Sequence, residues 1–169
     1  MALVVEDGSG LSGANSYATA AQADTYASDR GLSAWTGDTA TKEAALIRAT
    51  DYLEATYREA WLGYRATQTQ ALSWPRTNVE VDLYPIPADE VPVAVRNATI
   101  EMAIRALTED LLADQTQRVK REKVDVLEIE YADGSDATKR YPFVGRMLSA
   151  YIYGGSAEGG AFSTRVLRT

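Results

Sequence analysis

TKEAALIRATDYLEATYREAWLGYRATQTQALSWP, residues 41–75, is the most strongly patterned stretch of the chain. Its apolar residues recur at spacings of three and four, which places them on one face of a helix. Gly63 is a candidate end for this helix, and Thr39 or Thr41 is a candidate cap for its first turn. The charged residues between the apolar positions, Glu54 among them, can stay solvated. The remaining helices should pack around one stripe, formed by Leu46, Ala49 or Thr50, Leu53, Tyr57 and Trp61.

Three more helices are predicted on either side of this stretch. They cover residues 17–30, about 92–111, and 143–153. Asn15 or Ser16 is expected to cap the first, and Gly31 to end it. The second begins near Pro92, because proline suits a first helical turn, and its wide apolar arc belongs at the centre of a bundle. The pattern predicts a mainly α fold, a small bundle of about four helices.

The connector between residues 65 and 89 is predicted to be irregular, because Pro75, Pro85 and Pro87 each remove a backbone donor. The indole of Trp74 should pack over the helices, and Trp35 should be buried in the core. An acidic group in this region is expected to be solvated surface: Glu80, Asp82, Asp89 and Glu90.

A β-hairpin or extended arm is predicted between the last two helices. Residues 124–131 alternate in a strand-like pattern with one break, Asp133 and Gly134 signal a turn, and residues 138–141 provide a short return strand. A two-stranded hairpin is only marginally stable alone, so this one would gain from a neighbouring copy. The chain then divides into a helical domain at 1–153, which includes a hairpin arm at about 118–141, and a glycine-rich linker with a flexible C-terminal docking tail at 154–169.

The composition excludes several kinds of chemistry. The chain has 169 residues, no cysteine and no histidine, which removes disulfides, thiolate metal sites and histidine-dependent catalysis within this chain. The formal net charge of −7 argues against nucleic-acid binding by the whole surface. No apolar run approaches the ~20 residues of a membrane span, and the N-terminus lacks a secretory pattern. We expect a cytoplasmic protein of one domain.

No group of residues combines a nucleophile with a base, so no catalytic residue, cofactor or metal is expected. Gly8, Gly10 and Gly13 match a dinucleotide-binding spacing, but no alternating strand–helix pattern follows, which favours a plain loop. Glu101 and Arg105 are four apart on one helix, the arrangement of a solvated ion pair. A loosely calcium-like group lacks the closing glutamate of the calcium loop: Asp133, Ser135 and Asp136.

Five blocks of the sequence together resemble a group of tailed-bacteriophage proteins. The blocks are ALVVEDGSGLSGANSY, KEAALIRATDYLEATYREAWLGYR, QALSWPRTNV, IPADEVPVAVRNATIEMA and VKREKVDVLEIEYADG. The group is similar to head–tail connector adaptors, or head completion proteins, and is also labelled DnaT-like single-stranded-DNA-binding protein. The resemblance covers about residues 2–153, and the order of the blocks carries it more than any single residue.

The resemblance implies a structural virion protein of the head–tail neck, assembled in the host cytoplasm. Such adaptors form a ring, commonly dodecameric, under the portal, and join the capsid to the tail while leaving a channel for DNA. The implied partners are the portal protein, neighbouring copies, a downstream stopper or tail protein, and genomic DNA that passes without sequence-specific binding, with no membrane. Portal contact is expected from Phe162, Arg165, Val166, Leu167 and Arg168. Contact between copies is expected from Lys120, Arg121, Lys123, Val126, Ile129 and Tyr131.

The alternative is the DNA-binding label taken literally. Arg118, Lys120, Arg121 and Lys123 form a basic run against one acid, Glu122, and would contact phosphates in a salt-sensitive way. No aromatic residue lies within the run, so it lacks the stacking platform of single-strand binders. A solvated connector is an equally open interpretation of the run, and a small hydrolase or nucleotide binder is the weakest functional class.

Overall fold

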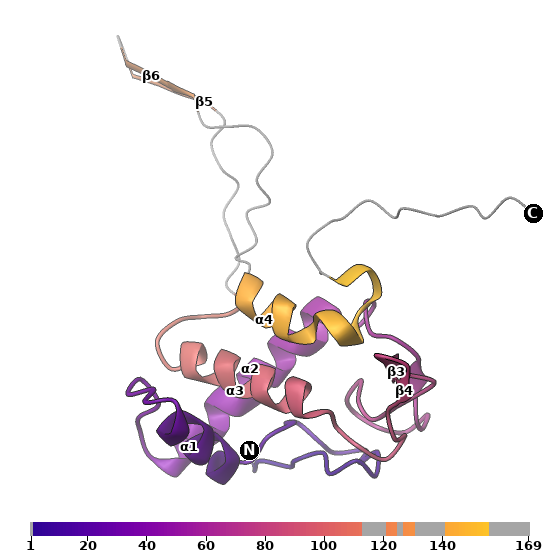
Figure 1. Ribbon diagram of the computed structural model, residues 1–169. Helices are drawn as coiled ribbons and strands as arrows, with labels where there is room; N and C mark the ends of the chain where they lie inside the picture. Colours follow the sequence, from indigo (N-terminus) through magenta and orange to yellow (C-terminus); the bar gives the residue numbers. More distant parts are fainter. Residues whose placement is uncertain (1, 113–120, 125–126, 131–140, 156–169) are drawn as a thin grey trace, which may run out of the picture.

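The computed structural model describes residues 2–112, 121–124, 127–130 and 141–155. This part of the chain holds four α-helices and three two-stranded antiparallel sheets (Figure 1). The fold is mainly α, as predicted. The helices are α1 (Ala20–Asp29), α2 (Thr39–Tyr57), α3 (Val93–Ala106) and α4 (Pro142–Leu148), and 3-10 turns follow at Ser149–Tyr151 and Tyr153–Gly155.

The sheets are short antiparallel pairs. β1 (Tyr64–Arg65) pairs with β2 (Arg76–Thr77), β3 (Glu80–Val81) pairs with β4 (Tyr84–Pro85), and β5 (Arg121–Val124) pairs with β6 (Leu127–Glu130). The first two pairs fall in the connector that was predicted to be irregular. Strands of two residues are too short to show an alternating pattern. Pro75 precedes β2 and Pro85 ends β4, positions at which a missing donor is tolerated.

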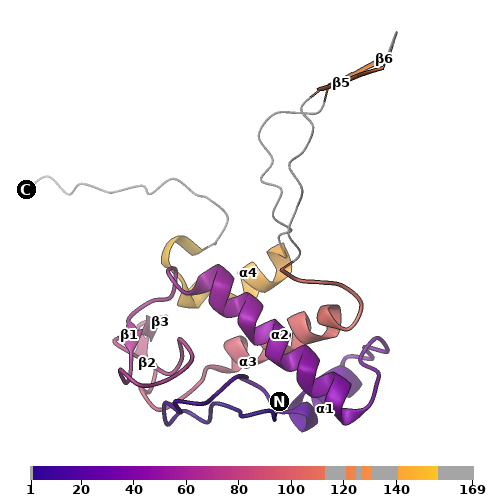
Figure 2. The same cartoon turned by 180° about the vertical axis from the view of Figure 1, so that it is seen from behind.

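Helices α2 and α3 pack against each other at the centre of the bundle. Helix α4 covers one side of this pair, and the N-terminal segment runs along the opposite side (Figure 1). Helix α1 lies at one end of the bundle, whereas β1–β4 lie at the other end, as the reverse view also shows (Figure 2). The end of the body that holds β1–β4 is therefore well separated from α1.

The predicted stripe of α2 forms the core of the bundle. Leu46, Ala49 and Leu53 have no exposed surface, and Tyr57 is almost completely buried. Trp61 is buried as well, but it lies after the end of the helix and not on its face as predicted. Each leucine buried in this way contributes about 1.5–3 kcal/mol relative to an exposed one. Helix α3 is buried over a wide arc, which confirms its predicted central position: Val95, Ala98, Thr99, Ile100, Met102, Ala103, Ile104 and Ala106.

Helix α2 begins and ends at residues other than those predicted. Asp38, rather than Thr39 or Thr41, caps it by accepting a hydrogen bond from the amide of Thr41 at 2.8 Å. The helix ends at Tyr57, well before Gly63. Gly63 has a φ of +66°, and a Cβ at this position would lie 2.1 Å from a backbone oxygen of β2. Its conformation permits the close approach to β2 rather than ending the helix.

Helix α1 has both ends closed by local hydrogen bonds. Thr19, rather than Asn15 or Ser16, forms a capping box with Gln22. Gly31 follows the helix with a φ of +63°, as predicted. The amide of Gly31 and the next amide donate back to the last turn at 3.2 and 2.9 Å, the pattern of a Schellman motif.

A row of aromatic rings joins the connector to the helices. Tyr57, Trp61, Trp74 and Tyr151 follow one another, with neighbouring ring centroids 5.8–5.9 Å apart. Trp74 is completely buried, which confirms its predicted packing, and its peptide bond to Pro75 is cis. A β-bridge from Trp61 to the segment after α4 closes the same region. The residues after α4 therefore belong to the core of the body.

Candidate functional site

Some of the residues predicted for contact between copies lie in the hairpin of β5 and β6. Arg121 and Lys123 are in β5, and Ile129 is in β6. The other predicted contact residues lie outside the described residues, as does the first residue of the basic run: Arg118, Lys120, Val126 and Tyr131. The five residues predicted for portal contact also lie outside them: Phe162, Arg165, Val166, Leu167 and Arg168.

The hairpin reverses at a different point from the predicted one. β5 pairs with β6, which follows it directly, whereas Asp133 and Gly134 signalled a turn further along the chain. Val124 pairs with Leu127, so the chain reverses its direction between these two residues. The break in the alternating pattern therefore marks the reversal of the chain, not an irregularity within one strand. The turn signal and the calcium-like group at 133–136 lie outside the described residues.

The register of the hairpin sets opposite charges across from each other. Arg121 pairs with Glu130, and Lys123 pairs with Glu128. Successive positions of a strand alternate between the two faces of the sheet, so these four positions share one face. The other face is mostly apolar and has the pairs Glu122 with Ile129 and Val124 with Leu127. The part of the basic run that lies in β5 is therefore matched by acidic positions in β6.

The helical body carries the net negative charge of the chain. Residues 2–112 and 141–155 contain 16 acidic and 9 basic residues, a difference of −7 that equals the charge of the whole sequence. An acidic surface repels the phosphates of nucleic acids. The body is therefore unsuited to general DNA binding.

Four of the basic side chains in the body are already engaged. Arg76 is buried and donates to backbone carbonyl oxygens at 2.6 and 2.7 Å, among others. Arg105 and Lys42 each form an ion pair with a carboxylate, at 2.9 and 2.8 Å. The guanidinium of Arg30 lies over a tyrosine ring, 3.6 Å from its centroid. These cations stabilise the fold and contribute little to a phosphate-binding surface.

Two carboxylates that were expected in solvent are partly buried. Glu54 accepts hydrogen bonds from the hydroxyl of Tyr17, and from the amide and hydroxyl of Ser73 at 3.1 and 2.7 Å. Burial and the nearby charge of Glu54 raise the pKa of Tyr17 well above its usual value. Glu101 pairs with Arg105, as predicted, but its side chain is only 12% exposed. The partners of Glu54 come from distant parts of the sequence, so its spacing on α2 could not reveal this role.

The glycine-rich loop near the N-terminus is filled by a carboxylate of the same segment. Glu6 is 3% exposed. Its oxygens accept hydrogen bonds from the amides of Gly8, Gly10 and Leu11 at 2.8–2.9 Å. Amides arranged in this way bind phosphate in nucleotide-binding loops, but here an anion of the protein already occupies them. The geometry agrees with a structural loop.

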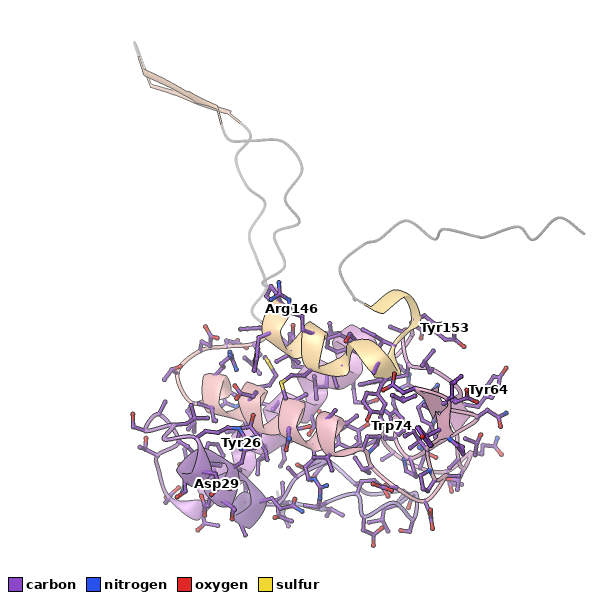
Figure 3. The ribbon with its side chains drawn as sticks, viewed as in Figure 1. Tyr26, Asp29, Tyr64, Trp74, Arg146 and Tyr153 are labelled. Atoms are coloured by element: carbon purple, nitrogen blue, oxygen red, sulfur yellow. The ribbon has the colours of Figure 1, made fainter. Side chains whose placement is uncertain are left out.

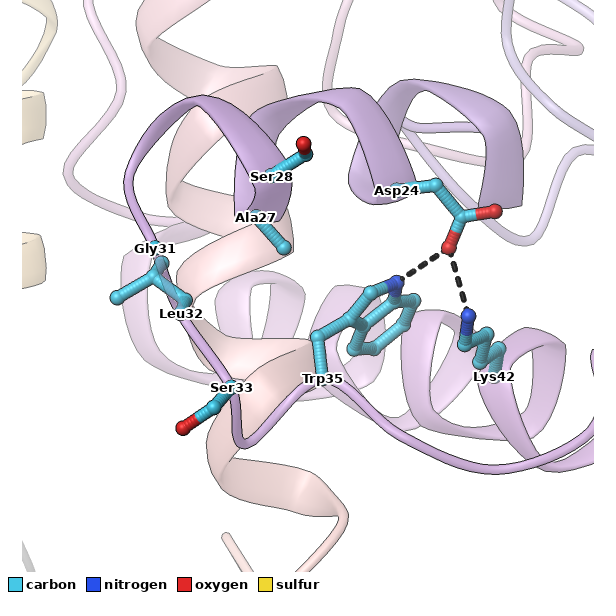
Figure 4. Close-up of a pocket in the computed structure, with 8 residues that line it drawn as sticks. All are labelled: Asp24, Ala27, Ser28, Gly31, Leu32, Ser33, Trp35 and Lys42. Atoms are coloured by element: carbon cyan, nitrogen blue, oxygen red, sulfur yellow. Dashed lines mark hydrogen bonds and ion pairs between the residues drawn. The ribbon is translucent and has the colours of Figure 1, made fainter.

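A pocket of about 500 Å³ opens between α1 and the start of α2 (Figure 4). Asp24 accepts hydrogen bonds from Lys42 at 2.8 Å and from the indole of Trp35 at 2.7 Å. These two hydrogen bonds hold the pKa of Asp24 below its usual value. Trp35 is buried, as predicted, and this pocket has its acid and its cation paired with each other. The arrangement anchors Trp35 between α1 and α2.

Exposed apolar side chains gather at the β1–β4 end of the body. Tyr64 and Tyr84 are 70% and 74% exposed, and Leu83 is 87% exposed. Tyr64 and Tyr153 lie along the same edge, whereas Trp74 lies inside it (Figure 3). The acidic residues predicted for this region are exposed, as expected: Glu80, Asp82, Asp89 and Glu90. The exposed acids at this end repel phosphates, so its tyrosines are poorly placed to bind nucleic acid.

Within the described ranges, no group of three or more acidic side chains is placed to hold a metal ion. None of the helices in the same ranges is long and apolar enough to cross a membrane.

A family model described as "Putative DnaT-like ssDNA binding protein" matches residues 1–169. The chain belongs to this family. The DnaT-like match extends past residue 153, so it includes the C-terminal segment that the resemblance in the sequence left out. Its description names single-stranded DNA and no role in a virion. Comparison with curated proteins and with solved structures finds no match.

Proposed function

We propose that this DnaT-like chain is a structural virion protein, a head–tail connector adaptor that forms a ring under the portal and joins the capsid to the tail. The observation that carries the proposal is the charge of the body, with 16 acidic against 9 basic residues and several of the basic ones engaged internally. Carboxylates around a channel repel the phosphates of a passing duplex, so the DNA moves without being held. The ordered blocks that resemble adaptors support the same function.

The proposed partners follow from the parts of the chain outside the helical bundle. The C-terminal residues Phe162, Arg165, Val166, Leu167 and Arg168 would contact the portal, and the hairpin arm would contact neighbouring copies. A downstream stopper or tail protein would bind the opposite side of the ring. Genomic DNA would pass without sequence-specific contact. The protein would act in the virion neck, as a structural component and not as an enzyme, after assembly in the host cytoplasm.

Negative-stain electron microscopy of the purified chain, alone and mixed with the portal ring of the same phage, tests this proposal. We expect a ring of the chain alone, or an additional collar on the portal. A chain truncated after Gly155 is the matched control, because it keeps the described body and lacks the proposed portal contacts; it should leave the portal bare. A full-length chain that leaves the portal unchanged and forms no ring would refute the adaptor function.

Single-stranded-DNA binding is the second candidate, and the family description favours it. The basic run 118–123 would supply the phosphate contacts. Four contacts predict a slope of about −3 for the logarithm of the binding constant against the logarithm of salt concentration. Replacing Arg118, Lys120, Arg121 and Lys123 by glutamine should then abolish both binding and slope. The control replaces Arg48, which is exposed on α2, and Arg58, which is exposed just after it. This variant should keep the DNA binding and the salt slope of the unmodified chain. An equal loss of binding in the two variants would refute a specific role of the run.

A further inference from the structure

The two strands of the hairpin carry opposite charge. β5 has the sequence REKV, with two basic residues, Arg121 and Lys123, and one acid. β6 has the sequence LEIE, with two acids, Glu128 and Glu130, and no basic residue. Their sheet contains two strands among the described residues, so each strand has one paired edge and one free edge. One free edge therefore belongs to a basic strand and the other to an acidic strand.

A free strand edge presents backbone N–H and C=O groups that can pair with another strand. A hairpin of four residues in each strand is marginal by itself and becomes stable when further strands extend the sheet. The apolar positions 124, 127 and 129 share the face opposite the charged positions. A neighbouring hairpin would extend this apolar face and so stabilise it. The hairpin is suited to lateral pairing with another hairpin.

We infer that the basic β5 edge of one copy pairs with the acidic β6 edge of the next copy, so that the hairpins join head to tail. This inference rests on the proposed function, because it names the contact through which adaptor copies form their ring. The pairing repeats between copies the charge relation of the hairpin itself, where Arg121 is opposite Glu130 and Lys123 is opposite Glu128. Pairing β5 with β5, or β6 with β6, brings like charges together.

The symmetry of such a contact favours a ring over a dimer. A contact between two different edges is heterologous, and a heterologous contact repeated by rotation about one axis closes into a ring. Rotation about an axis along the strands leaves every β5 running one way and every β6 the other way. Neighbouring edges are then antiparallel, as β5 and β6 already are within one chain. The same strand geometry therefore serves inside the hairpin and between hairpins.

Two variants of the full-length chain test the contact. Arg121→Glu with Lys123→Glu makes both edges acidic, and Glu128→Lys with Glu130→Lys makes both edges basic. Alone, each variant has like charges at every contact between copies, and we expect at least a tenfold rise in the concentration needed for half-maximal ring formation on the portal. An equimolar mixture restores opposite charges at each contact, so rings should return with the two variants alternating. Mass photometry with a mass tag on one variant measures the composition.

The mixture separates contact between copies from stability of the hairpin itself. Each variant has like charges across its own hairpin, whether it is alone or mixed, so only a contact between copies explains rescue by mixing. A chain with all four changes, which exchanges the charges of the two strands, should assemble alone like the unmodified chain.

Each other outcome overturns the inference in a recognisable way. Single variants that assemble like the unmodified chain, or a mixture that regains no rings, would refute the pairing of β5 with β6 while leaving the adaptor function intact. Unmodified chain that forms no ring and no portal collar would refute the adaptor function, and the inference with it.

Discussion

Glu54 joins three parts of the molecule at one carboxylate. It lies on α2, accepts a hydrogen bond from Tyr17 in the N-terminal segment, and accepts two from Ser73 in the connector. The hydroxyl of Tyr17 also accepts a hydrogen bond from the amide of Trp74 at 3.1 Å, which ties the buried indole to the same network. Hydrogen bonds to a charged, partly buried acceptor are worth more than those between neutral groups.

Replacing Glu54 by glutamine should therefore destabilise the fold. Glutamine has nearly the same shape, but its amide nitrogen is a donor and would face the donors of Tyr17 or Ser73. We expect a loss of about 1–3 kcal/mol in the free energy of unfolding, measured by urea denaturation at pH 7. The matched control is Glu59→Gln, at an exposed position just after α2, which should change the stability little. Equal effects of the two substitutions would contradict the role of the network.

Asp24 should make stability depend on pH at the acidic end. Its pKa is below the usual 3.8 in the folded protein, because Lys42 and Trp35 donate hydrogen bonds to the ionised form. The unfolded chain therefore binds the proton more readily, and the contribution of Asp24 is complete above about pH 4 and disappears as the pH falls through the lower folded-state pKa. The carboxylate is 53% exposed, so solvent screening keeps the contribution below about 1 kcal/mol.

The measurement compares Asp24→Asn with the unmodified chain by denaturant unfolding between pH 7 and pH 2. We expect the unmodified chain to be more stable at pH 7 and the difference to vanish towards pH 2. Asp29→Asn, an exposed position on the same helix, is the control. A difference that persists at the lowest pH would show that the substitution acts through packing and not through the charge.

At the residue scale, the sequence predicted buried apolar side chains well and polar roles poorly. The core positions of α2 follow from spacing alone, because burial repeats with the helical period. The caps at Asp38 and Thr19 lie just outside that pattern, and neighbouring serines and threonines compete for the same role. Glu54 could not be identified, since the groups that bind it are brought close by the fold. The donors to Glu6 are amides of its own segment, and backbone groups leave no signal in the pattern of side chains.

The turn between β3 and β4 has an unusual residue at its tip. Asp82 and Leu83 are its central residues, with φ values of +53° and +70°. Turns with two positive φ values favour asparagine or aspartate followed by glycine, and a leucine in this conformation costs roughly 1–2 kcal/mol. Leu83 is 87% exposed, so its side chain recovers little of this cost within the body.

Leu83→Gly should therefore stabilise the chain by up to about 1 kcal/mol, because glycine adopts a positive φ without steric cost. Thermal unfolding followed by circular dichroism measures the change. Leu112→Gly is the control, since Leu112 is also exposed and has no positive φ; its melting temperature should stay level or fall. A lower melting temperature for Leu83→Gly would show that the side chain contributes to the fold.

At the element scale, the sequence predicted the four helices and missed the small sheets of the connector. Helices of seven to nineteen residues leave a repeating pattern, and two-residue strands leave none. The hairpin arm was predicted, but its turn was assigned to Asp133 and Gly134, because that dipeptide is a strong local turn signal. The register of β5 and β6 could be read only from the structure.

At the scale of the whole molecule, the body should end shortly after α4. Tyr151 packs edge-on against Trp74, with ring centroids 5.9 Å apart, and Trp61 bridges to Ile152. Truncation after Gly155 keeps these contacts and should leave the melting temperature within a few degrees of that of the full chain. Truncation after Leu148 removes them and should cost about 3 kcal/mol or more.

Differential scanning calorimetry of the two truncated chains distinguishes these effects. If the boundary between the helical domain and the C-terminal segment is as predicted, the chain truncated after Gly155 should unfold in one transition, like the full chain. If the longer chain were strongly destabilised, the C-terminal segment would belong to the folded body. The functional assignment would then need a different portal contact.

The contact between Tyr141 and Glu109 has a consequence for how this protein can diversify. The hydroxyl of Tyr141 donates to the carboxylate of Glu109 at 2.9 Å, and its ring packs edge-on against Tyr52 in α2. These residues lie close to the points where the chain leaves the body after α3 and re-enters it before α4. The helical bundle is thus fastened near both points, so changes of sequence or length between residues 113 and 140 should have little effect on the core. The same bundle could then acquire new assembly partners by changes in this stretch of sequence alone.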